Sequence, residues 1–301
     1  MIKITSDSAC DLSPEMLDRY SVKTVPLYIN FYTGESLRDG VECTPDDIFK
    51  SFETTKKTPK TAAPPPSDYE EMFKKVMEDG CDGIVHISIN SEFSSSYQNA
   101  ILAARQVSPN IRVVDARTLS SMQGLMVIRA CEMAQSGAGL DEIANAMTEQ
   151  RRKNNSDFIL GGLDYAARGG RCPMLVALGA NLLKIRPMMR IDEKGKISTP
   201  KKFRGAYIEA AKKYLDSLFE NIENIDFSKV FISYTSFNAE VMKLVRERLA
   251  SLPQKFEAVF EARTNCTVAT HGGPETLAVF YYKKNLPEQK AKLGLPFIGR
   301  G

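Results

Sequence analysis

Several residue types and sequence patterns are scarce or missing in this chain of 301 residues. It has no tryptophan and only two histidines, His86 and His271, and its six cysteines stand alone, with no C-x-x-C pair. Structural zinc sites need closely spaced cysteine and histidine ligands, so we expect no metal site. Scattered thiols in a chain of this size are more typical of small buried residues than of disulfides.

Long apolar runs and an imbalance of charge are also missing. No run approaches the roughly 18 apolar residues of a membrane-spanning helix, and the opening MIKITSDSACD lacks the apolar stretch of a secretory signal. The 40 Lys and Arg residues and 37 Asp and Glu residues are spread along the chain, so the net charge of +3 forms no basic stripe. We therefore expect a cytoplasmic protein without a nucleic-acid partner.

Four sequence motifs that carry well-understood chemistry are missing as well. The chain contains neither the P-loop pattern G-x-x-x-x-G-K-[ST] nor the dinucleotide pattern G-x-G-x-x-G after a strand. It also lacks the metalloprotease pattern H-E-x-x-H and the hydrolase elbow G-x-S-x-G. We expect neither a nucleotide cofactor nor a metal cofactor.

Short apolar runs alternate with amphipathic segments of helical length, which is typical of an α/β fold. The clearest unit is a strand at residues 83–89, a polar loop, a helix at residues 97–107 and a strand at residues 111–114. We expect further strands at residues 2–5 and 22–31, and helices that start after Ser13, Thr44 and Ser67. The charged stretch at residues 150–155 suggests a boundary, so we predict two α/β domains, residues 1–155 and 156–301, with a ligand cleft between them.

Two segments carry side chains that suit an anionic ligand, and a third, at Thr61, indicates no function by itself. Ser94 lies in a hydroxyl-rich loop before a helix, where free backbone N–H groups favour negative charge; a simple helix cap is the alternative. Thr61 precedes a proline run that holds its loop extended. His271 lies in a loop rich in glycine and proline, where the backbone can approach a ligand closely, although a surface histidine on a turn is equally compatible. His86, within an apolar strand, is better interpreted as a core histidine.

Arginines and acids near the glycines and the first strand give further candidates. Arg171 follows two glycines and Arg204 precedes one, an arrangement that suits recognition of a carboxylate or phosphate, or plain solvent exposure. Asp7 and Asp11, after the first strand, could bind a metal or a phosphate, but such residues also form turns and caps unaided, which is the interpretation we favour.

Taken together, several segments resemble the DegV family. They are ITSDSACDL from residue 4, the loop of Thr61, SEFSSSYQ from residue 91, RGGR from residue 168 and HGGP from residue 271, in order along nearly the whole chain. The resemblance implies two α/β domains that hold a long-chain fatty acid between them. It further implies that the carboxylate is bound by Thr61, Ser94 and His271.

The resemblance also implies a partner. Family members of the bacterial fatty acid kinase system present the bound acid to a separate ATP-using subunit, which phosphorylates its carboxylate. We therefore expect a non-enzymatic carrier with no catalytic residue, docked to a kinase through Arg171 and Arg204, and transient contact with a membrane surface. This chain has Ser95 where the family usually has glycine and Ala167 where it usually has a basic residue.

Methionine is frequent, with 12 residues, and its flexible side chain suits an adaptable lipid tunnel. The candidate tunnel walls, with ordinary core as the alternative, are Met122, Met126, Met174, Leu175, Leu178, Leu182, Leu183 and Met188.

Two other functions stay open. One is a serine hydrolase or acyltransferase that uses Ser94 as nucleophile and His271 as base, which requires the two side chains within hydrogen-bond reach and an acid behind the histidine. The other is a surface-interaction or regulatory domain whose cleft is empty.

Overall fold

The computed structural model describes residues 1–172 and 185–285. Its first sheet is parallel, with strand order β2-β1-β6-β7. These strands are β1 (Ile2–Asp7), β2 (Lys23–Val25), β6 (Gly83–Ser88) and β7 (Ile111–Asp115). Their carboxyl ends meet at one edge of the sheet, which is where ligands bind in open α/β folds.

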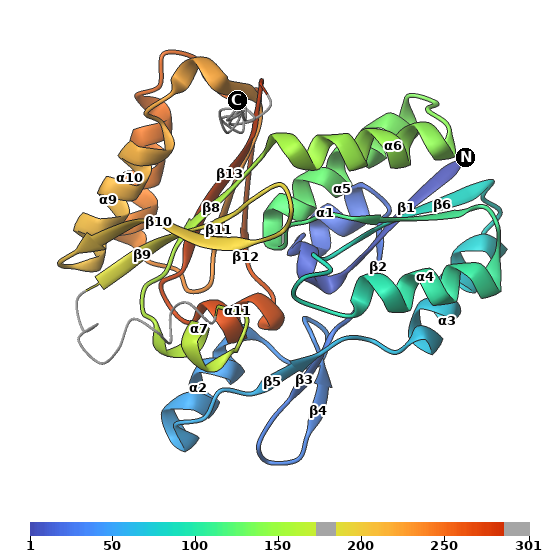
Figure 1. The fold of residues 1–301 in the computed structure, drawn as a ribbon, viewed down its shortest axis with the longest axis horizontal. Helices are drawn as coiled ribbons and strands as arrows, with labels where there is room; N and C mark the ends of the chain where they lie inside the picture. Colours follow the sequence, from blue (N-terminus) through green and yellow to red (C-terminus); the bar gives the residue numbers. More distant parts are fainter. Residues whose placement is uncertain (173–184, 286–301) are drawn as a thin grey trace, which may run out of the picture.

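Helices cover both faces of this sheet (Figure 1). On one face the aromatic and alanine side chains of α3 (Pro66–Glu78) and α4 (Ser96–Val107) pack against the strands. The other face is covered by α1 (Pro14–Arg19), α5 (Ser120–Gln135) and α6 (Leu140–Gln150). Short 3-10 turns are η1 (Ser8–Cys10), η2 (Arg151–Lys153) and η3 (Ile222–Asn224).

The second sheet has the order β10-β9-β8-β13-β11-β12 and is mostly antiparallel. One face packs on α9 (Tyr207–Leu218) and α10 (Ala239–Ala250). α5 also packs against β11 and β13, so it lies between the two sheets (Figure 1). The strands are β8 (Asn154–Ile159), β9 (Ile185–Ile191), β10 (Ile197–Arg204), β11 (Ile225–Tyr234), β12 (Ala258–Arg263) and β13 (Leu277–Lys283).

A third, small sheet lies below the two larger ones in Figure 1. It has the order β4-β3-β5, made of β3 (Tyr28–Asn30), β4 (Ser36–Arg38) and β5 (Lys60–Ala62). With α2 (Pro45–Thr55) it packs on α7 (Asp164–Arg168) and α11 (Cys266–Gly272). Their shared core contains Ile29, Ile48, Tyr165 and Cys266.

The α/β class and several helix starts agree with the sequence-based expectations. Ser13 caps α1 by accepting a hydrogen bond from the backbone N–H of Met16, and Thr44 forms a capping box with Asp47 at α2. One expected strand was wrong: residues 22–31 form β2 and β3 in different sheets, because Pro26 has no N–H to continue a ladder. The helix expected after Ser67 already begins at Pro66.

The expected boundary near residue 155 falls inside β8, the first strand of the second sheet. The division into domains 1–155 and 156–301 stays a prediction. The apolar segment at residues 173–183 lies outside the described residues. Within residues 1–172 and 185–285, no helix combines the length and the apolar character that crossing a bilayer requires.

Candidate ligand-binding site

A cavity lies where the carboxyl ends of the first sheet face the second sheet and α11. The empty space within its walls is about 1010 Å³ when the open solvent at its mouth is included. Most of the lining is apolar and comes from many separate segments. Apolar lining residues include Leu27, Ile89, Phe93, Leu119, Phe158, Leu160, Ile191, Ile197, Val268, Ala278 and Phe280.

The three residues expected to bind a carboxylate all line this cavity. Thr61, on β5, and His271, on α11, are in direct contact: the Oγ1 atom of Thr61 lies 2.9 Å from Nε2 of His271. The expected loop at His271 was wrong, because this residue belongs to the last turn of a seven-residue helix. Its ring is therefore held by helical backbone rather than by a flexible turn.

His271 has little room around its second nitrogen. Nδ1 is buried and has no hydrogen-bond partner among the described residues. A Cβ on Gly169 would lie 2.3 Å from this nitrogen, so only glycine fits there. Burial and the nearby charge of Arg171 lower the pKa of His271 to about 4, so the ring is neutral near pH 7. A neutral imidazole can still donate one N–H to a ligand.

Ser94 lies just before α4, in the loop that follows β6. Its Oγ atom lies 2.8 Å from Oγ of Ser96 and accepts a hydrogen bond of 3.2 Å from the backbone N–H of Ser96. The N-cap residue of α4 is Ser95, whose side chain makes no capping hydrogen bond, so Ser94 accepts a backbone N–H from the first residue of the helix without being its cap. On α4, Asn99 donates to the carbonyl of Pro64, which ties this helix to the segment that carries Thr61.

The two arginines expected to dock a partner have different surroundings. Arg171 is exposed and lines the cavity, and its guanidinium donates to the carbonyls of Phe93 and Gly169. It therefore lies beside both Ser94 and His271. Arg204 is the last residue of β10, is exposed, and is not among the lining residues. The next helix along the chain, α9, begins at Tyr207.

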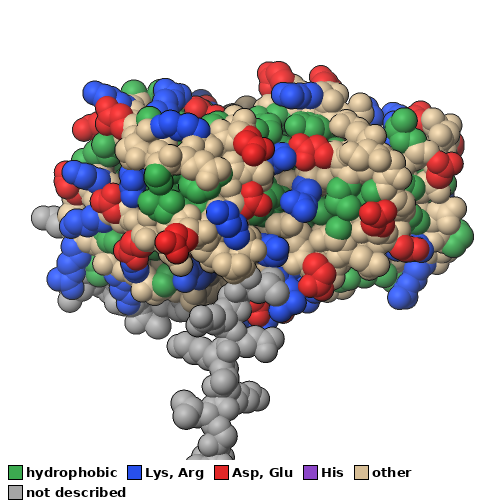
Figure 2. Space-filling model, turned by 90° about the horizontal axis from the view of Figure 1, so that it is seen from above, with side chains coloured by type: hydrophobic (Ala, Val, Ile, Leu, Met, Phe, Trp, Pro, Cys, Tyr) green, Lys and Arg blue, Asp and Glu red, His purple; other side chains and the backbone are tan. Residues whose placement is uncertain are grey.

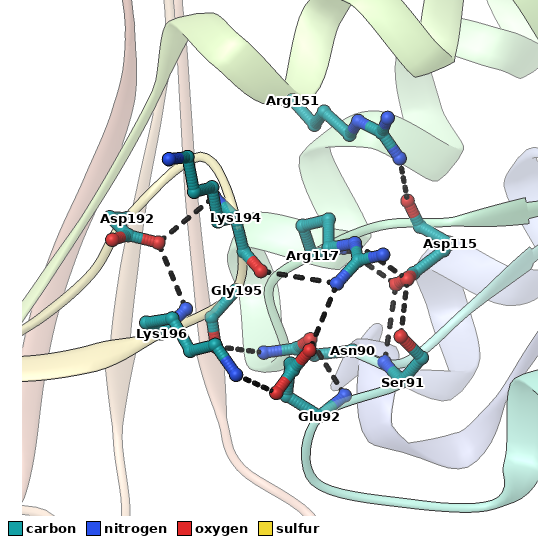
Figure 3. A network of polar contacts seen from close by, with 10 residues as sticks. All are labelled: Asn90, Ser91, Glu92, Asp115, Arg117, Arg151, Asp192, Lys194, Gly195 and Lys196. Atoms are coloured by element: carbon teal, nitrogen blue, oxygen red, sulfur yellow. Dashed lines mark hydrogen bonds and ion pairs between the residues drawn. The ribbon is translucent and has the colours of Figure 1, made fainter.

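A hairpin of the second sheet contributes to the cavity wall, and polar contacts join its tip to the loop after β6 (Figure 3). At its tip the carbonyl of Gly195 accepts a 2.8 Å hydrogen bond from Asn90, and Lys196 pairs with Glu92. Arg117 donates to the carbonyl of Lys194 and also pairs with Glu92. These contacts fix the tip against the loop that leads to Ser94. The residues flanking the tip, Ile191 and Ile197, line the cavity beside Ile89 and Phe93.

The acids after the first strand have structural partners. Asp7 is fully buried and accepts hydrogen bonds from the backbone of Ile89 and the side chains of Ser88 and Gln123. Burial raises its pKa to about 6. His86 is also fully buried, and its Nδ1 atom lies 3.0 Å from the hydroxyl of Thr5. These residues belong to the scaffold, in line with the interpretation that we favoured.

Three of the expected tunnel residues do not line the cavity. Met122, Met126 and Met188 are buried in core clusters and are not among the lining residues. The other candidates, Met174, Leu175, Leu178, Leu182 and Leu183, lie outside the described residues. Sequence analysis missed the real walls on β8 and β13, although Phe158 and Leu160, and likewise Ala278 and Phe280, show the two-residue period of a strand face.

The hydrogen bonds do not form the arrangement of a hydrolase triad. Ser94 is bonded to Ser96 and His271 to Thr61, and no carboxylate within residues 1–172 and 185–285 contacts the imidazole. In the same residues, no group of three or more histidine, cysteine or acidic side chains could hold a metal ion. The geometry instead gathers neutral hydrogen-bonding groups and one arginine at the mouth of an apolar cavity, which suits an amphipathic anion.

Comparison with known proteins supports the resemblance along the whole fold. A DegV domain-containing protein of Clostridium perfringens is 30% identical over 94% of this chain and 99% of its own length. The solved structure of a DegV family protein from Thermus thermophilus, described as binding fatty acid, is 28% identical and has a TM-score of 0.85 over 94% of this chain and 99% of that one.

A more distant structure shows the same fold. The fatty acid kinase protein Fak B3 of Streptococcus pneumoniae, loaded with linoleic acid, has a TM-score of 0.80 at 21% identity, over 94% of this chain and 99% of its own. The sequence model of the DegV family matches residues 1–284. This chain therefore belongs to the DegV family.

Proposed function

We propose that this protein binds one long-chain fatty acid in the cavity, with the carboxylate held by Thr61, Ser94 and His271. The observation that carries the proposal is the contact of 2.9 Å between Thr61 and His271 inside an otherwise apolar cavity. Both residues, like Ser94, can donate a hydrogen bond to an anion.

The energetics favour such a ligand. Each buried methylene contributes about 0.8 kcal/mol, so a long acyl chain gains on the order of 10 kcal/mol before the costs of binding. A carboxylate keeps its charge out of water only where donors replace its hydration. The hydroxyls of Thr61 and Ser94, the imidazole of His271 and the guanidinium of Arg171 are donors of this kind at the cavity.

The second part of the proposal is that the protein presents the bound carboxylate to a separate fatty acid kinase subunit. Arg171 is exposed at the head-group region and Arg204 is exposed at the end of β10, so both are available to a partner. The face shown in Figure 2 has acidic and basic side chains interspersed, without a continuous area of one sign.

A carrier of this kind would work in the cytoplasm and touch the membrane surface transiently to exchange acids with it. It needs no cofactor and no catalytic residue of its own. Chemistry on the acid would occur on the partner kinase.

Extraction of the purified protein followed by mass spectrometry tests the proposal. We expect about one long-chain fatty acid per chain, and a rise in the unfolding temperature when fatty acid is added to delipidated protein. A clean extract together with no thermal shift would contradict binding, and would favour a regulatory domain with an empty cleft. Hydrolysis of an activated ester that is lost in Ser94→Ala would favour the hydrolase instead.

A further inference from the structure

Away from the head-group residues, the cavity contains hydroxyls that a plain hydrocarbon tail does not need. Ser120, Ser233 and Thr264 all line it, and each of these residues is at most 5% exposed. The hydroxyl of Thr264 is buried and has no hydrogen-bond partner among the described residues. A buried hydroxyl without a partner is costly, so this position calls for an explanation.

Three contacts place these hydroxyls together. Ser120 donates a 2.7 Å hydrogen bond to Oδ2 of Asp11, and its Oγ atom lies 3.4 Å from Oγ of Ser233. The other oxygen of Asp11 accepts a 2.7 Å bond from the backbone N–H of Asn265, the neighbour of Thr264. Ser233 pairs with Ala262 across parallel strands, and Thr264 lies two positions further, on the same face.

This hydroxyl cluster, Ser120, Ser233 and Thr264, lies apart from the carboxylate site. Thr264 precedes the start of α11 and His271 is near its end, and a helix rises about 1.5 Å per residue, so about 9 Å of axis separates the N-cap from His271. A fatty acid whose carboxylate is at His271 would therefore pass the cluster along the middle of its chain.

We propose that the hydroxyl cluster is a second polar subsite, which binds a hydroxyl group in the middle of an acyl chain. This inference rests on the proposed fatty acid binding and names a substrate class for it: long-chain hydroxy fatty acids. Thr264 donates to the oxygen of the ligand hydroxyl, and the ligand hydroxyl donates to Ser233. Ser233 in turn donates to Ser120, whose own proton goes to Asp11.

A set of four acids tests this subsite by direct binding to delipidated protein: stearate, 3-hydroxystearate, 10-hydroxystearate and 12-hydroxystearate. We expect at least one of the two mid-chain hydroxy acids to bind about threefold to tenfold more tightly than stearate, as one net hydrogen bond allows. The 3-hydroxy acid, whose hydroxyl lies beside the carboxylate, should show no such gain.

Thr264→Val and Thr270→Val form a matched pair of variants. Both threonines have a buried hydroxyl without a partner among the described residues, but Thr270 is not a lining residue. The mid-chain preference should disappear in Thr264→Val and persist in Thr270→Val. The subsite would be overturned if stearate bound more tightly than both mid-chain acids, or if the mid-chain preference survived in Thr264→Val. Neither outcome would contradict the proposed binding of fatty acids. If none of the four acids binds, the proposed function fails with it.

Discussion

The hydroxyl of Thr61 and the imidazole of His271 lie 2.9 Å apart although 210 positions separate them in the chain. The contact joins β5 of the small sheet to α11 and places both side chains in the cavity wall. Nε2 of His271 faces Thr61, while Nδ1 faces the backbone of Gly169. The ring therefore has one hydrogen bond, at Nε2, and little room on the Nδ1 side, which limits its orientations before any ligand binds.

Removing a single donor should weaken binding of the carboxylate without unfolding the protein. For Ser94→Ala and His271→Ala we expect losses of about 1–3 kcal/mol, or roughly fivefold to 150-fold in affinity, because one oxygen of a desolvated carboxylate loses its partner. Titration with a free fatty acid and with its methyl ester measures this. The native protein should prefer the free acid and the variants should discriminate less; unchanged affinity for the acid in both would rule out this head-group site.

Gly169 should be required for the position of His271. A Cβ at residue 169 would lie 2.3 Å from Nδ1, whereas a Cβ at Gly162 would meet nothing within 4 Å. We therefore expect Gly169→Ala to displace the ring and to lower fatty acid affinity about tenfold, near the effect of losing the histidine donor. Gly162→Ala is the matched control and should bind like the native protein. Equal affinities for the two variants would show that the ring adapts without loss.

Affinity for fatty acid should rise as the pH falls from about 7 to about 5. In the empty site the pKa of His271 is lowered to about 4, so the ring is neutral. A bound carboxylate favours the protonated ring and so raises the pKa of His271. At a pH between the pKa of the empty site and that of the occupied site, binding therefore takes up a proton. The gain is at most about tenfold per pH unit. This gain in affinity should vanish in His271→Asn. Identical pH profiles for the native protein and His271→Asn would contradict a direct contact between the imidazole and the carboxylate.

Arg171 and Arg204 should differ in their effect on binding. A purely docking role for both arginines would leave fatty acid affinity unchanged in either alanine variant. Because Arg171 lines the cavity and lowers the pKa of His271, we now expect Arg171→Ala to reduce affinity by about twofold to fivefold. Arg204→Ala should leave affinity unchanged. Arg171→Ala and Arg204→Ala should each slow acyl-phosphate formation with the cognate kinase. Normal rates with both variants would show that neither arginine takes part in docking.

The hairpin tip should depend on glycine at position 195. Gly195 and Gly80 have nearly the same φ, +81° and +80°, but a Cβ at Gly195 would lie 2.4 Å from Oδ1 of Asn90, while one at Gly80 would meet nothing within 4 Å. At a positive φ an alanine is strained in the left-handed region of backbone conformation, and this cost is shared by Gly195→Ala and Gly80→Ala. Gly195→Ala should lose about 1–3 kcal/mol more of unfolding free energy, from the clash. Urea unfolding of the two variants measures the difference, and equal losses would show that the tip moves aside freely.

Much of the local structure follows from the sequence. The caps at Ser13 and Thr44, the strand and helix around Ser94, and the α/β class depend on signals that act within a few residues. The small sheet could not be predicted in this way, because each of its strands has three residues, too few to show a period. The helix of His271 was hidden for a similar reason, since it has only seven residues, and its last residue, Gly272, is followed by Gly273.

The sequence by itself, through its resemblance to the DegV family, pointed to Thr61, Ser94 and His271 as the candidates for binding a carboxylate. The tertiary structure alone decided that Thr61 and His271 touch, that Gly169 leaves room for the ring, and that faces of β8 and β13 form part of the cavity wall. The physical reason is distance along the chain. Caps and periodicity arise from neighbouring residues, whereas a cavity wall depends on how strands and helices from distant segments pack together.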